Sequence, residues 1–380
     1  MPIRVTVGAE TRQGERRVAL VPEVIARISQ QGFDIQVAKS AGAGSYLNDA
    51  DFVAAGAVIV SESEAMYNGT DIILRVQAPT VEEVARFPEG VVLIGLLQPH
   101  RHPDVVKALK ARRITSFSME LLPRISRAQS MDVLSSQATV AGYQAVLIGA
   151  RLSPRFFPML TTAAGTIRPS KVLILGAGVA GLQAIATARR LGAVVEAYDV
   201  RAAAAEQVES LGAKFLKVDV KAEAEGGYAR ELTDDEKQVQ QAMLADAIAA
   251  ADVVITTAQI PGRPAPKMIS ADMVARMKSG AVIVDLAAES GGNCELTRCG
   301  ETVTQGAVVI HGPQDIASEM SVHASEMYAR NLQRFIDLMK AEDGALKLDW
   351  EDEIIAGAVL THDGEIRHPA TRELLEGTGA

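Results

Sequence analysis

The chain has 380 residues, of which 38 are Lys or Arg and 47 are Asp or Glu, giving a net charge of −9. This length predicts two or three domains, with two as the working number, and the acidic balance excludes a nucleic-acid surface, which needs clustered Lys and Arg. No apolar run approaches the ~18 residues of a membrane-spanning helix and the start lacks a signal-peptide pattern, so we expect a soluble chain with no membrane span of its own.

Apolar runs alternate with helical patterns in the first third of the chain. With 48% apolar and only 4% aromatic residues, this alternation is typical of a parallel sheet covered by helices. Gly42 and Gly44 follow a strand but lack a third glycine, so we interpret them as a structural turn before a helix cap. The expected strands are 3–7, 35–38, 58–60, 72–76, 91–97 and 114–119, and the expected helices are 22–31, 49–55 and 103–113.

A glycine-rich turn follows the strand-like run 171–175. Gly176, Gly178 and Gly181 match the pattern G-x-G-x-x-G, and a helical pattern, 182–191, comes next. The first glycine permits a tight turn, the second lets a pyrophosphate approach the backbone, and the third lets the helix lie close to the strand. The helix N-terminus then presents free N–H groups to the phosphates. The residues expected to contact a dinucleotide here are Gly176, Gly178, Val179, Ala180 and Gly181.

Asp199 closes the next apolar run, 194–198. A carboxylate at the end of this strand accepts hydrogen bonds from the adenosine ribose and repels a 2′-phosphate, so NAD(H) is favoured over NADP(H). Arg201 is the opposing signal, because NADP sites use an arginine in this neighbourhood. We therefore predict NAD(H), with Asp199, Val200 and Arg201 around the ribose.

The remainder of the second half continues the alternation. Ligands of open parallel sheets bind outside the carboxyl ends of the strands near the switch in strand order, so we expect 257–262 and 285–287 beside the cofactor. Cys294 and Cys299 lie in one loop without metal-ligand spacing, so neither a metal site nor a disulfide is predicted. The expected strands are 214–218, 252–258, 281–287 and 307–311, and the expected helices are 236–251 and 271–278.

Helical patterns at 132–149 and 322–340 lie on either side of this region, and 346–380 returns to short strands and turns. The predicted fold class is α/β, with two Rossmann-like, doubly wound parallel-sheet domains separated by a cleft and joined by two long helices. We place the first domain at 1–134 plus 322–380 and the NAD(H)-binding domain at 135–321.

The segment 219–235 is too long for an ordinary connection and carries Gly226 and Gly227 beside Tyr228. Loops of this length are often lids or binding loops, and the alternative is a solvated acidic excursion.

The run 123–137, which reads PRISRAQSMDVLSSQ, resembles the signature loop of the NAD(H)-binding component, domain I, of proton-translocating nicotinamide nucleotide transhydrogenase. The similarity extends along nearly the whole chain. It includes Arg17-Val18-Ala19 with Pro22, the glycine turn, Asp199-Val200-Arg201, Gly226-Gly227-Tyr228-Ala229, the run 261–266 and Gly291-Gly292-Asn293-Cys294.

The resemblance implies that a loop from the other domain reaches over the nicotinamide. Glutamine can orient a nicotinamide without titrating, and an Arg/Asp pair can hold the loop and the cofactor in place; the alternative for Arg124 and Asp132 is an ion pair at a helix start. The segment around Tyr228 would be a lid that excludes water. The implied catalytic residues are Arg124, Gln129, Asp132 and Ser135, and further cofactor neighbours are Ile125, Ser126, Arg127, Gly227, Tyr228, Gln240 and Gln259.

The same resemblance implies a homodimer that sits peripherally on the cytoplasmic, inner face of the plasma membrane through partner subunits. Hydride would pass from NADH bound here to NADP⁺ on a separate NADP(H)-binding component. Proton translocation would belong to a membrane-spanning proton-channel subunit. Since this chain ends at Ala380 without hydrophobic segments, we expect these partners to be separate polypeptides, unless the chain is a cut piece.

Two other functions stay open. Alanine dehydrogenase shares this architecture, but its reaction needs titratable groups, which that family supplies as a lysine and a histidine. The corresponding places here look like Gln77 and Gln98, and His100 and His102 are interpreted as displaced loop histidines. A non-catalytic NAD(H) sensor would fit the glycine turn equally well, although it has no need for Gln129 at a nicotinamide face.

Overall fold

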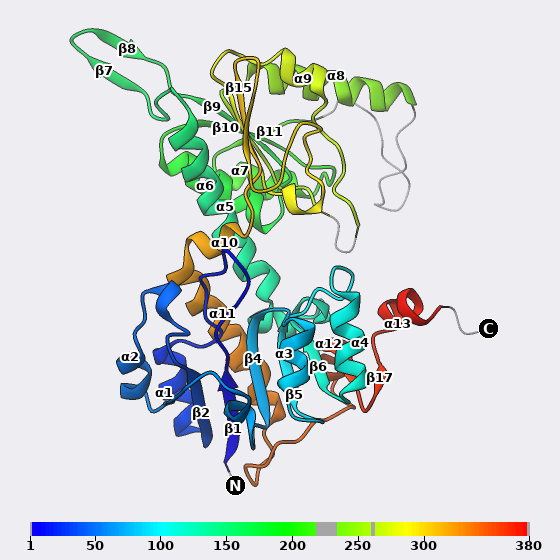
Figure 1. Cartoon of the computed structure of the whole chain (residues 1–380). Coiled ribbons are helices and arrows are strands. Elements are labelled where there is room, and N and C mark those ends of the chain that lie inside the picture. Colours follow the sequence, from blue (N-terminus) through cyan, green and yellow to red (C-terminus); the bar gives the residue numbers. More distant parts are fainter. Residues whose placement is uncertain (1, 218–233, 260–262, 378–380) are drawn as a thin grey trace. The chain divides into compact units, whose positions relative to one another are not determined.

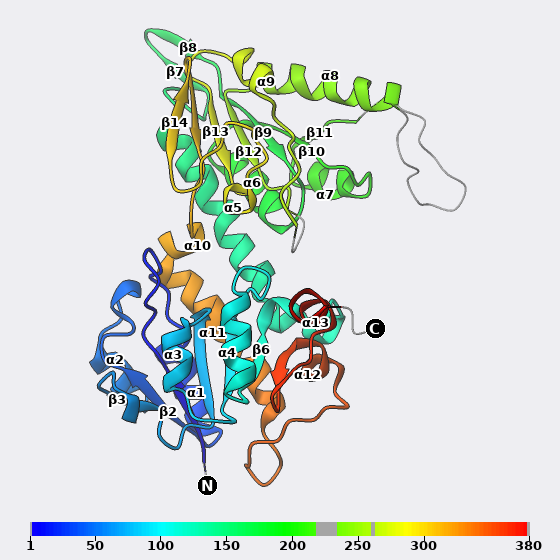
Figure 2. The same ribbon diagram turned by 45° about the vertical axis from the view of Figure 1, so that its right-hand side comes forward.

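The chain, seen in a computed structural model, is described for residues 2–217, 234–259 and 263–377. It forms two compact units (Figures 1 and 2): one contains the residues up to Gln137 and those from Ala317 onward, and the other is Ala138–Ile316. Within the described ranges, no helix is both long and apolar enough to cross a bilayer.

The first unit is built on an eight-stranded sheet. Its strand order is β17-β16-β6-β5-β4-β1-β2-β3. The strands β1 to β6 pair in parallel, and β16 and β17 extend the edge as antiparallel strands. The strands are β1 (Ile3–Val7), β2 (Phe33–Ala38), β3 (Val58–Val60), β4 (Ile72–Gln77), β5 (Val92–Leu96), β6 (Thr115–Ser118), β16 (Val359–His362) and β17 (Glu365–Ile366).

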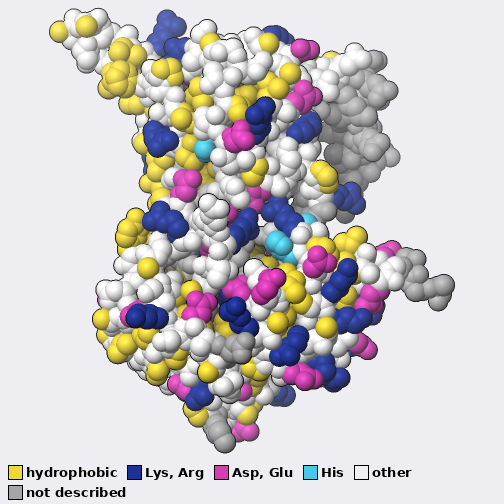
Figure 3. Space-filling view, in the orientation of Figure 1, with side chains coloured by type: hydrophobic (Ala, Val, Ile, Leu, Met, Phe, Trp, Pro, Cys, Tyr) yellow, Lys and Arg dark blue, Asp and Glu magenta, His cyan; other side chains and the backbone are white. Residues whose placement is uncertain are grey.

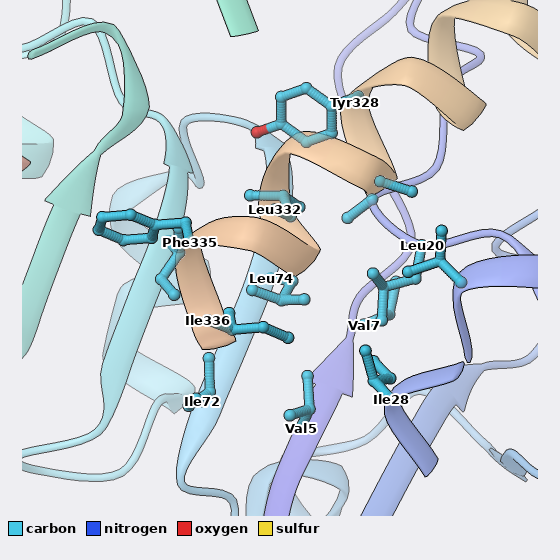
Figure 4. Packing of buried hydrophobic residues seen from close by; sticks show 14 of the residues in the cluster. Val5, Val7, Leu20, Ile28, Ile72, Leu74, Tyr328, Leu332, Phe335 and Ile336 are labelled. Atoms are coloured by element: carbon cyan, nitrogen blue, oxygen red, sulfur yellow. The ribbon is translucent and has the colours of Figure 1, made fainter. Parts of the chain in front are cut away.

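Helices cover both faces of this sheet, because its parallel strands are apolar on both sides. Figure 4 shows Leu332 and Ile336 of one helix, α11, packed over Ile72 and Leu74 of β4. On the other face, Ile73 of β4 belongs to a separate apolar cluster with residues of α3 and α4. The helices of this unit are α1 (Pro22–Gln30), α2 (Asp49–Ala54), α3 (Val81–Arg86), α4 (Pro103–Ala111), α11 (Ser321–Ile336), α12 (Glu353–Ala358) and α13 (Pro369–Glu376).

The second unit is built on a seven-stranded sheet with the order β11-β10-β9-β12-β13-β15-β14. Only β14 is antiparallel to its neighbour. The strands are β9 (Lys171–Leu175), β10 (Val194–Tyr198), β11 (Lys214–Phe215), β12 (Val253–Thr256), β13 (Val282–Asp285), β14 (Thr302–Gln305) and β15 (Val308–His311), and a separate hairpin is formed by β7 (Leu160–Thr162) and β8 (Gly165–Ile167).

Successive residues of β9 point to opposite faces of this sheet. Val172 and Ile174 pack with α5, α6 and α7, whereas Leu173 and Leu175 pack with α8 and α9. The sheet is therefore doubly wound, as the unbroken apolar run at β9 predicted. The helices are α5 (Val133–Leu152), which begins in the first unit, α6 (Val179–Arg190), α7 (Ala204–Ser210), α8 (Asp234–Ala250) and α9 (Ala271–Ala275).

The strand orders confirm the predicted fold class of two Rossmann-like α/β domains. In each sheet the first strand, β1 or β9, is flanked on one side by the next strand in sequence and on the other by a later one. Such a change of direction marks the place where ligands bind in open parallel sheets. The chain therefore carries two topological switch points, one after β1 and one after β9.

Three details differ from the expectations. The terminal segment 346–380, expected as strands and turns, also contains α12 and α13. The β7–β8 and β14–β15 hairpins were not expected, and both are built largely from exposed residues without an apolar run. The second crossing of the chain between the units falls at α10 (Ile316–Glu319), a single turn ahead of α11, and not in a long helix.

Candidate functional site

The glycine turn follows β9 at the switch point of the second sheet. Gly176 has φ of +102°, and a Cβ there would lie 2.5 Å from the Oγ1 of Thr257. A Cβ on Gly181 would lie 1.9 Å from the carbonyl oxygen of Gly176. These two glycines are therefore required by the packing of the protein itself, as the fingerprint predicts.

Gly178 is different, because a Cβ built there would meet no atom within 4 Å. It is the residue that precedes α6, and its carbonyl accepts the N–H of Leu182 at 2.8 Å. The protein gives no reason for a glycine at this position, whereas a pyrophosphate lying against the backbone would. The open space beside Gly178, at the N-terminus of a 12-residue helix, fits a dinucleotide phosphate. Val179 is 43% exposed and Ala180 is half-buried.

Gly142 is a residue of this cradle that sequence reasoning missed. It lies in α5, and a Cβ there would come within 2.1 Å of the carbonyl oxygen of Ala180. It thus allows α5 to pack directly against the first turn of α6. A glycine in the middle of a strongly apolar helix was the available signal, since it costs helix stability unless close packing requires it.

Asp199 follows β10 and reaches back to the glycine turn. Its Oδ2 accepts the N–H of Ala177 at 2.7 Å, and its Oδ1 accepts the N–H of Arg201 at 2.9 Å. The guanidinium of Arg201 pairs with both oxygens, Nε with Oδ1 at 2.9 Å and Nη2 with Oδ2 at 3.0 Å. Burial alone would raise the pKa of Asp199, but these hydrogen bonds outweigh it and hold the pKa below its usual value. Val200 beside it is exposed.

The ends of β12 and β13 supply the neighbouring loops. Thr257 donates its hydroxyl to the carbonyl of Gly176 at 3.1 Å. Asn293 holds Ala258 from both sides, since its Oδ1 accepts the Ala258 N–H at 3.1 Å and its Nδ2 donates to the Ala258 carbonyl at 2.8 Å. Gln259 is exposed and donates to the carbonyl of Leu286 at 2.6 Å. These bonds fix the loop that leaves β12 next to the glycine turn.

The other predicted neighbours are placed only in part. Gln240, in α8, donates its amide to the hydroxyl of Tyr198 at the end of β10. Gly227 and Tyr228 lie outside the described residues.

The loop that contains Arg124 and Gln129 belongs to the first unit, where residues 126–131 form 3₁₀ turns. Both side chains are exposed, and in the portion of the chain that the structure describes neither makes a hydrogen bond or an ion pair. Asp132 is not paired with Arg124. Its carboxylate instead accepts the N–H and the hydroxyl of Ser135, at 2.9 and 2.6 Å, and so caps the start of α5.

Arg127 is engaged with a distant segment of the same unit. Its guanidinium makes two bonds of 2.7 Å to the carboxylate of Asp352, which also caps α12. This pair fixes the loop to α12, while Ile125 is half-buried and Ser126 is exposed.

The switch point of the first sheet is filled by the protein's own charges. The side chain of Glu15 is fully buried and pairs with Arg17, which is 5% exposed, at 2.6 Å. Gln77 donates its amide to Glu15 at 2.8 Å and accepts from Arg12 at 3.1 Å. Burial would raise the pKa of Glu15, but the bonds and charge of Arg17 and the bond from Gln77 lower it to about 2.

A second buried pair lies beside the first. The guanidinium of Arg75, which is 1% exposed, bonds to Glu10 at 3.2 Å and to Glu83 at 2.9 Å. Burial, opposed by the charge of Arg75, raises the pKa of Glu10. Nothing in the separate sequence positions of these carboxylates and arginines indicated that they would meet.

Gln98 lies after β5 in the left-handed region, with φ of +44°. Its N–H donates to Glu120 and its side-chain oxygen accepts from Arg101 at 3.2 Å. Burial, with the nearby charge of Arg101, lowers the pKa of His100, and burial with Arg12 and Arg101 does the same for His102.

Comparison with known proteins agrees with this architecture. The models of the N-terminal and C-terminal domains of alanine dehydrogenase/PNT match residues 6–141 and 145–369. An NAD(P) transhydrogenase alpha subunit of Rhodospirillum rubrum is 46% identical over 388 residues, covering 100% of both chains.

Two solved structures share the fold over almost the whole chain. Transhydrogenase from Sinorhizobium meliloti has a TM-score of 0.85 at 42% identity, covering 97% of this chain and 99% of that one. An L-alanine dehydrogenase has a TM-score of 0.82 at 24% identity, covering 98% and 99%, which shows a common fold. This chain belongs to the alanine dehydrogenase/PNT family and, within it, to the alpha subunits of NAD(P) transhydrogenase.

Proposed function

We propose that this chain binds NAD(H) at the glycine turn and exchanges hydride with NADP(H) held by a separate component, with NADH as donor and NADP⁺ as acceptor. The open space beside Gly178 supports a bound pyrophosphate, and Asp199 supports a ribose without a 2′-phosphate. When bound, NAD(H) supplies the hydride. The chain's own residues bind it, orient it and exclude water from it.

The observation that carries this proposal is the state of Gln77 and Gln98. An amino-acid dehydrogenase must move protons at an amine, and in this family we expect its titratable groups at these two positions. Here both are amides, and each amide is already bonded to charged neighbours. Hydride exchange between two nicotinamides transfers no proton to solvent, so it needs no acid or base at either position.

Arg124 and Gln129 are proposed to orient the nicotinamide, because exposed side chains without internal bonds are available to a ligand. Asp132 and Ser135 would brace the start of α5 behind them. Arg127 would hold the loop through Asp352, with Ile125 and Ser126 completing the contact. The segment around Tyr228 is proposed as the lid, with Gln240 and Gln259 as neighbours of the cofactor.

The assembly is proposed to be a homodimer attached to the inner face of the plasma membrane through its partners. The name of the Rhodospirillum relative, which describes one piece of an alpha subunit, supports further subunits, and proton translocation is assigned to a membrane-spanning one. Apolar side chains at and beside the β7–β8 hairpin support a second copy: Phe156 is 55%, Met159 is 62% and Ile167 is 46% exposed (Figure 3). Acidic and basic side chains are intermingled over the face shown.

The test combines the purified chain with the NADP(H)-binding component of a transhydrogenase and follows hydride transfer from NADH to an NADP⁺ analogue. Each protein alone serves as the control, and alanine with NAD⁺ is assayed in parallel. Rapid transfer only in the mixture supports the proposal. Alanine oxidation by the chain alone overturns it in favour of an amino-acid oxidoreductase, and NADH binding without transfer in the mixture overturns it in favour of a sensor.

A further inference from the structure

The Asp199 carboxylate has no acceptor position left for a ligand. A carboxylate offers about four lone-pair sites, and here it accepts two bonds at each oxygen, from the N–H groups of Ala177 and Arg201 and from the Arg201 guanidinium. The Asp199 side chain is 8% exposed because Arg201, which is 63% exposed, lies over it. Arg201 therefore occupies the place where ribose hydroxyls would bond.

Two of these four bonds can be exchanged and two cannot. The N–H of Ala177 belongs to the glycine turn and that of Arg201 to the main chain after β10, so both are fixed in place. The guanidinium stands on a flexible, exposed side chain. Ribose hydroxyls can replace its two bonds while the arginine moves into water, which leaves no buried charge unpaired.

A 2′-phosphate meets the opposite situation. It would lie against the Asp199 charge, and the one cation beside it in the described structure is already neutralised by that same carboxylate. Guanidinium groups bind phosphate in a two-bond geometry, the one Arg201 now uses toward Asp199. Loss of the Asp199 charge would remove the repulsion and release the arginine together.

We propose that Arg201 is a latent ligand for the 2′-phosphate of NADP(H), which Asp199 holds inactive, so that the pair and not Asp199 alone determines specificity for NAD(H). This inference rests on the proposed function, because it takes the glycine turn as the nucleotide site. It names Arg201 as the residue through which a change at Asp199 alters specificity.

The experiment measures Kd for NADH and NADPH by fluorescence titration of the full chain. The variants are Asp199→Asn, which keeps an acceptor for the Ala177 N–H, Arg201→Gln, and the double variant. We expect Asp199→Asn to bind NADPH at least about tenfold more tightly than the wild type does, and the double variant to lose that gain. Arg201→Gln should keep NADH binding and still discriminate against NADPH.

Asp246→Asn is the matched control, because Asp246 pairs with Arg276 at 2.8 Å in the same unit and the change in net charge is identical. Its NADH to NADPH ratio should equal that of the wild type. Thermal melting checks the fold, and Asp199→Ser replaces Asp199→Asn if the latter does not fold. Displacement of NADH by adenosine 2′,5′-bisphosphate compared with 5′-AMP isolates the 2′-phosphate.

Equal NADPH affinity of Asp199→Asn and the double variant would overturn the role of Arg201 while leaving NAD(H) binding intact. Failure of the wild-type chain to bind NADH would overturn the proposed function itself. The two failures are thus distinguished by the wild-type titration.

Discussion

The carboxylate of Glu15 and the guanidinium of Arg17 form a two-bond pair inside the first unit, with Nη2–Oε2 of 2.6 Å and Nε–Oε1 of 2.8 Å. Gln137 accepts from the same guanidinium at 2.8 Å, and Ser318 donates to the same carboxylate at 2.9 Å. Gln137 is the last residue before the chain enters the second unit, and Ser318 follows its return. One buried ion pair therefore anchors both ends of the first unit's chain break.

Replacing Glu15 with Gln should lower the free energy of unfolding by about 3–5 kcal/mol, because Arg17 would stay buried without its counter-charge. Urea unfolding followed by circular dichroism measures the loss. Glu23→Gln, which alters a half-exposed pair with Arg27 on α1, is the control and should cost below about 1 kcal/mol. A loss for Glu15→Gln as small as that of the control would contradict a structural role for the pair.

The advantage of the wild type over Glu15→Gln should depend on pH. The pKa of Glu15 is about 2 in the folded protein against a usual 4.5, so the folded state binds fewer protons there and stability falls as pH drops between these values. The advantage should be complete above about pH 5 and shrink steadily towards pH 2. Glu10, whose raised pKa acts in the opposite sense, titrates in both proteins and cancels. A pH-independent difference would rule this explanation out.

Substitutions of two glycines should separate binding from folding. Gly178→Ala places a methyl group in open space, so the melting temperature should be unchanged while NADH binding weakens by at least about tenfold, or about 1.4 kcal/mol. Gly181→Ala places it 1.9 Å from a backbone oxygen and should lower both. Calorimetric melting and NADH titration are the measurements. Full NADH affinity in a folded Gly178→Ala protein would mean that no phosphate lies there.

Gln129→Asn shortens an exposed side chain by one methylene without changing its chemistry. If Gln129 orients the nicotinamide, hydride transfer in the mixture should slow by about 100-fold, since a misplacement of about 1 Å is costly, while the Kd for NADH changes little. Ser130→Ala, on the same 3₁₀ turn, is the control and should leave both unchanged. Equal losses in rate and affinity would show that Gln129 only binds.

The sheets could be predicted because their strands are buried on both faces. The run Lys171–Leu175 is apolar at every position after the first, which makes a parallel strand visible without any partner. The strand Thr302–Gln305 has no such run, since it is antiparallel and largely exposed, and so it was missed. The helix Pro369–Glu376 was missed although Pro369 at its first position is a start signal.

The candidate site could be predicted only where its contacts are local. The glycine turn and Asp199 are recognised by spacing within one strand-helix-strand unit. Thr257 and Gly142 reach the same turn from other elements, β12 and α5, and which elements lie beside β9 follows from the strand order alone. The bond from Asp132 to Ser135 spans three residues and was within reach of capping rules, whereas the Glu15–Arg17–Gln77 network was not.

The two sheets repeat one strand order, and so the chain offers two crevices of the same topological kind. The one after β1 contains Gln77 and the carboxylates of Glu10 and Glu15, which already satisfy one another and the adjacent arginines. The one after β9 keeps open space at Gly178. The expected stoichiometry is therefore one nucleotide per chain, so that isothermal titration with NADH should saturate at a molar ratio of one despite the doubled architecture.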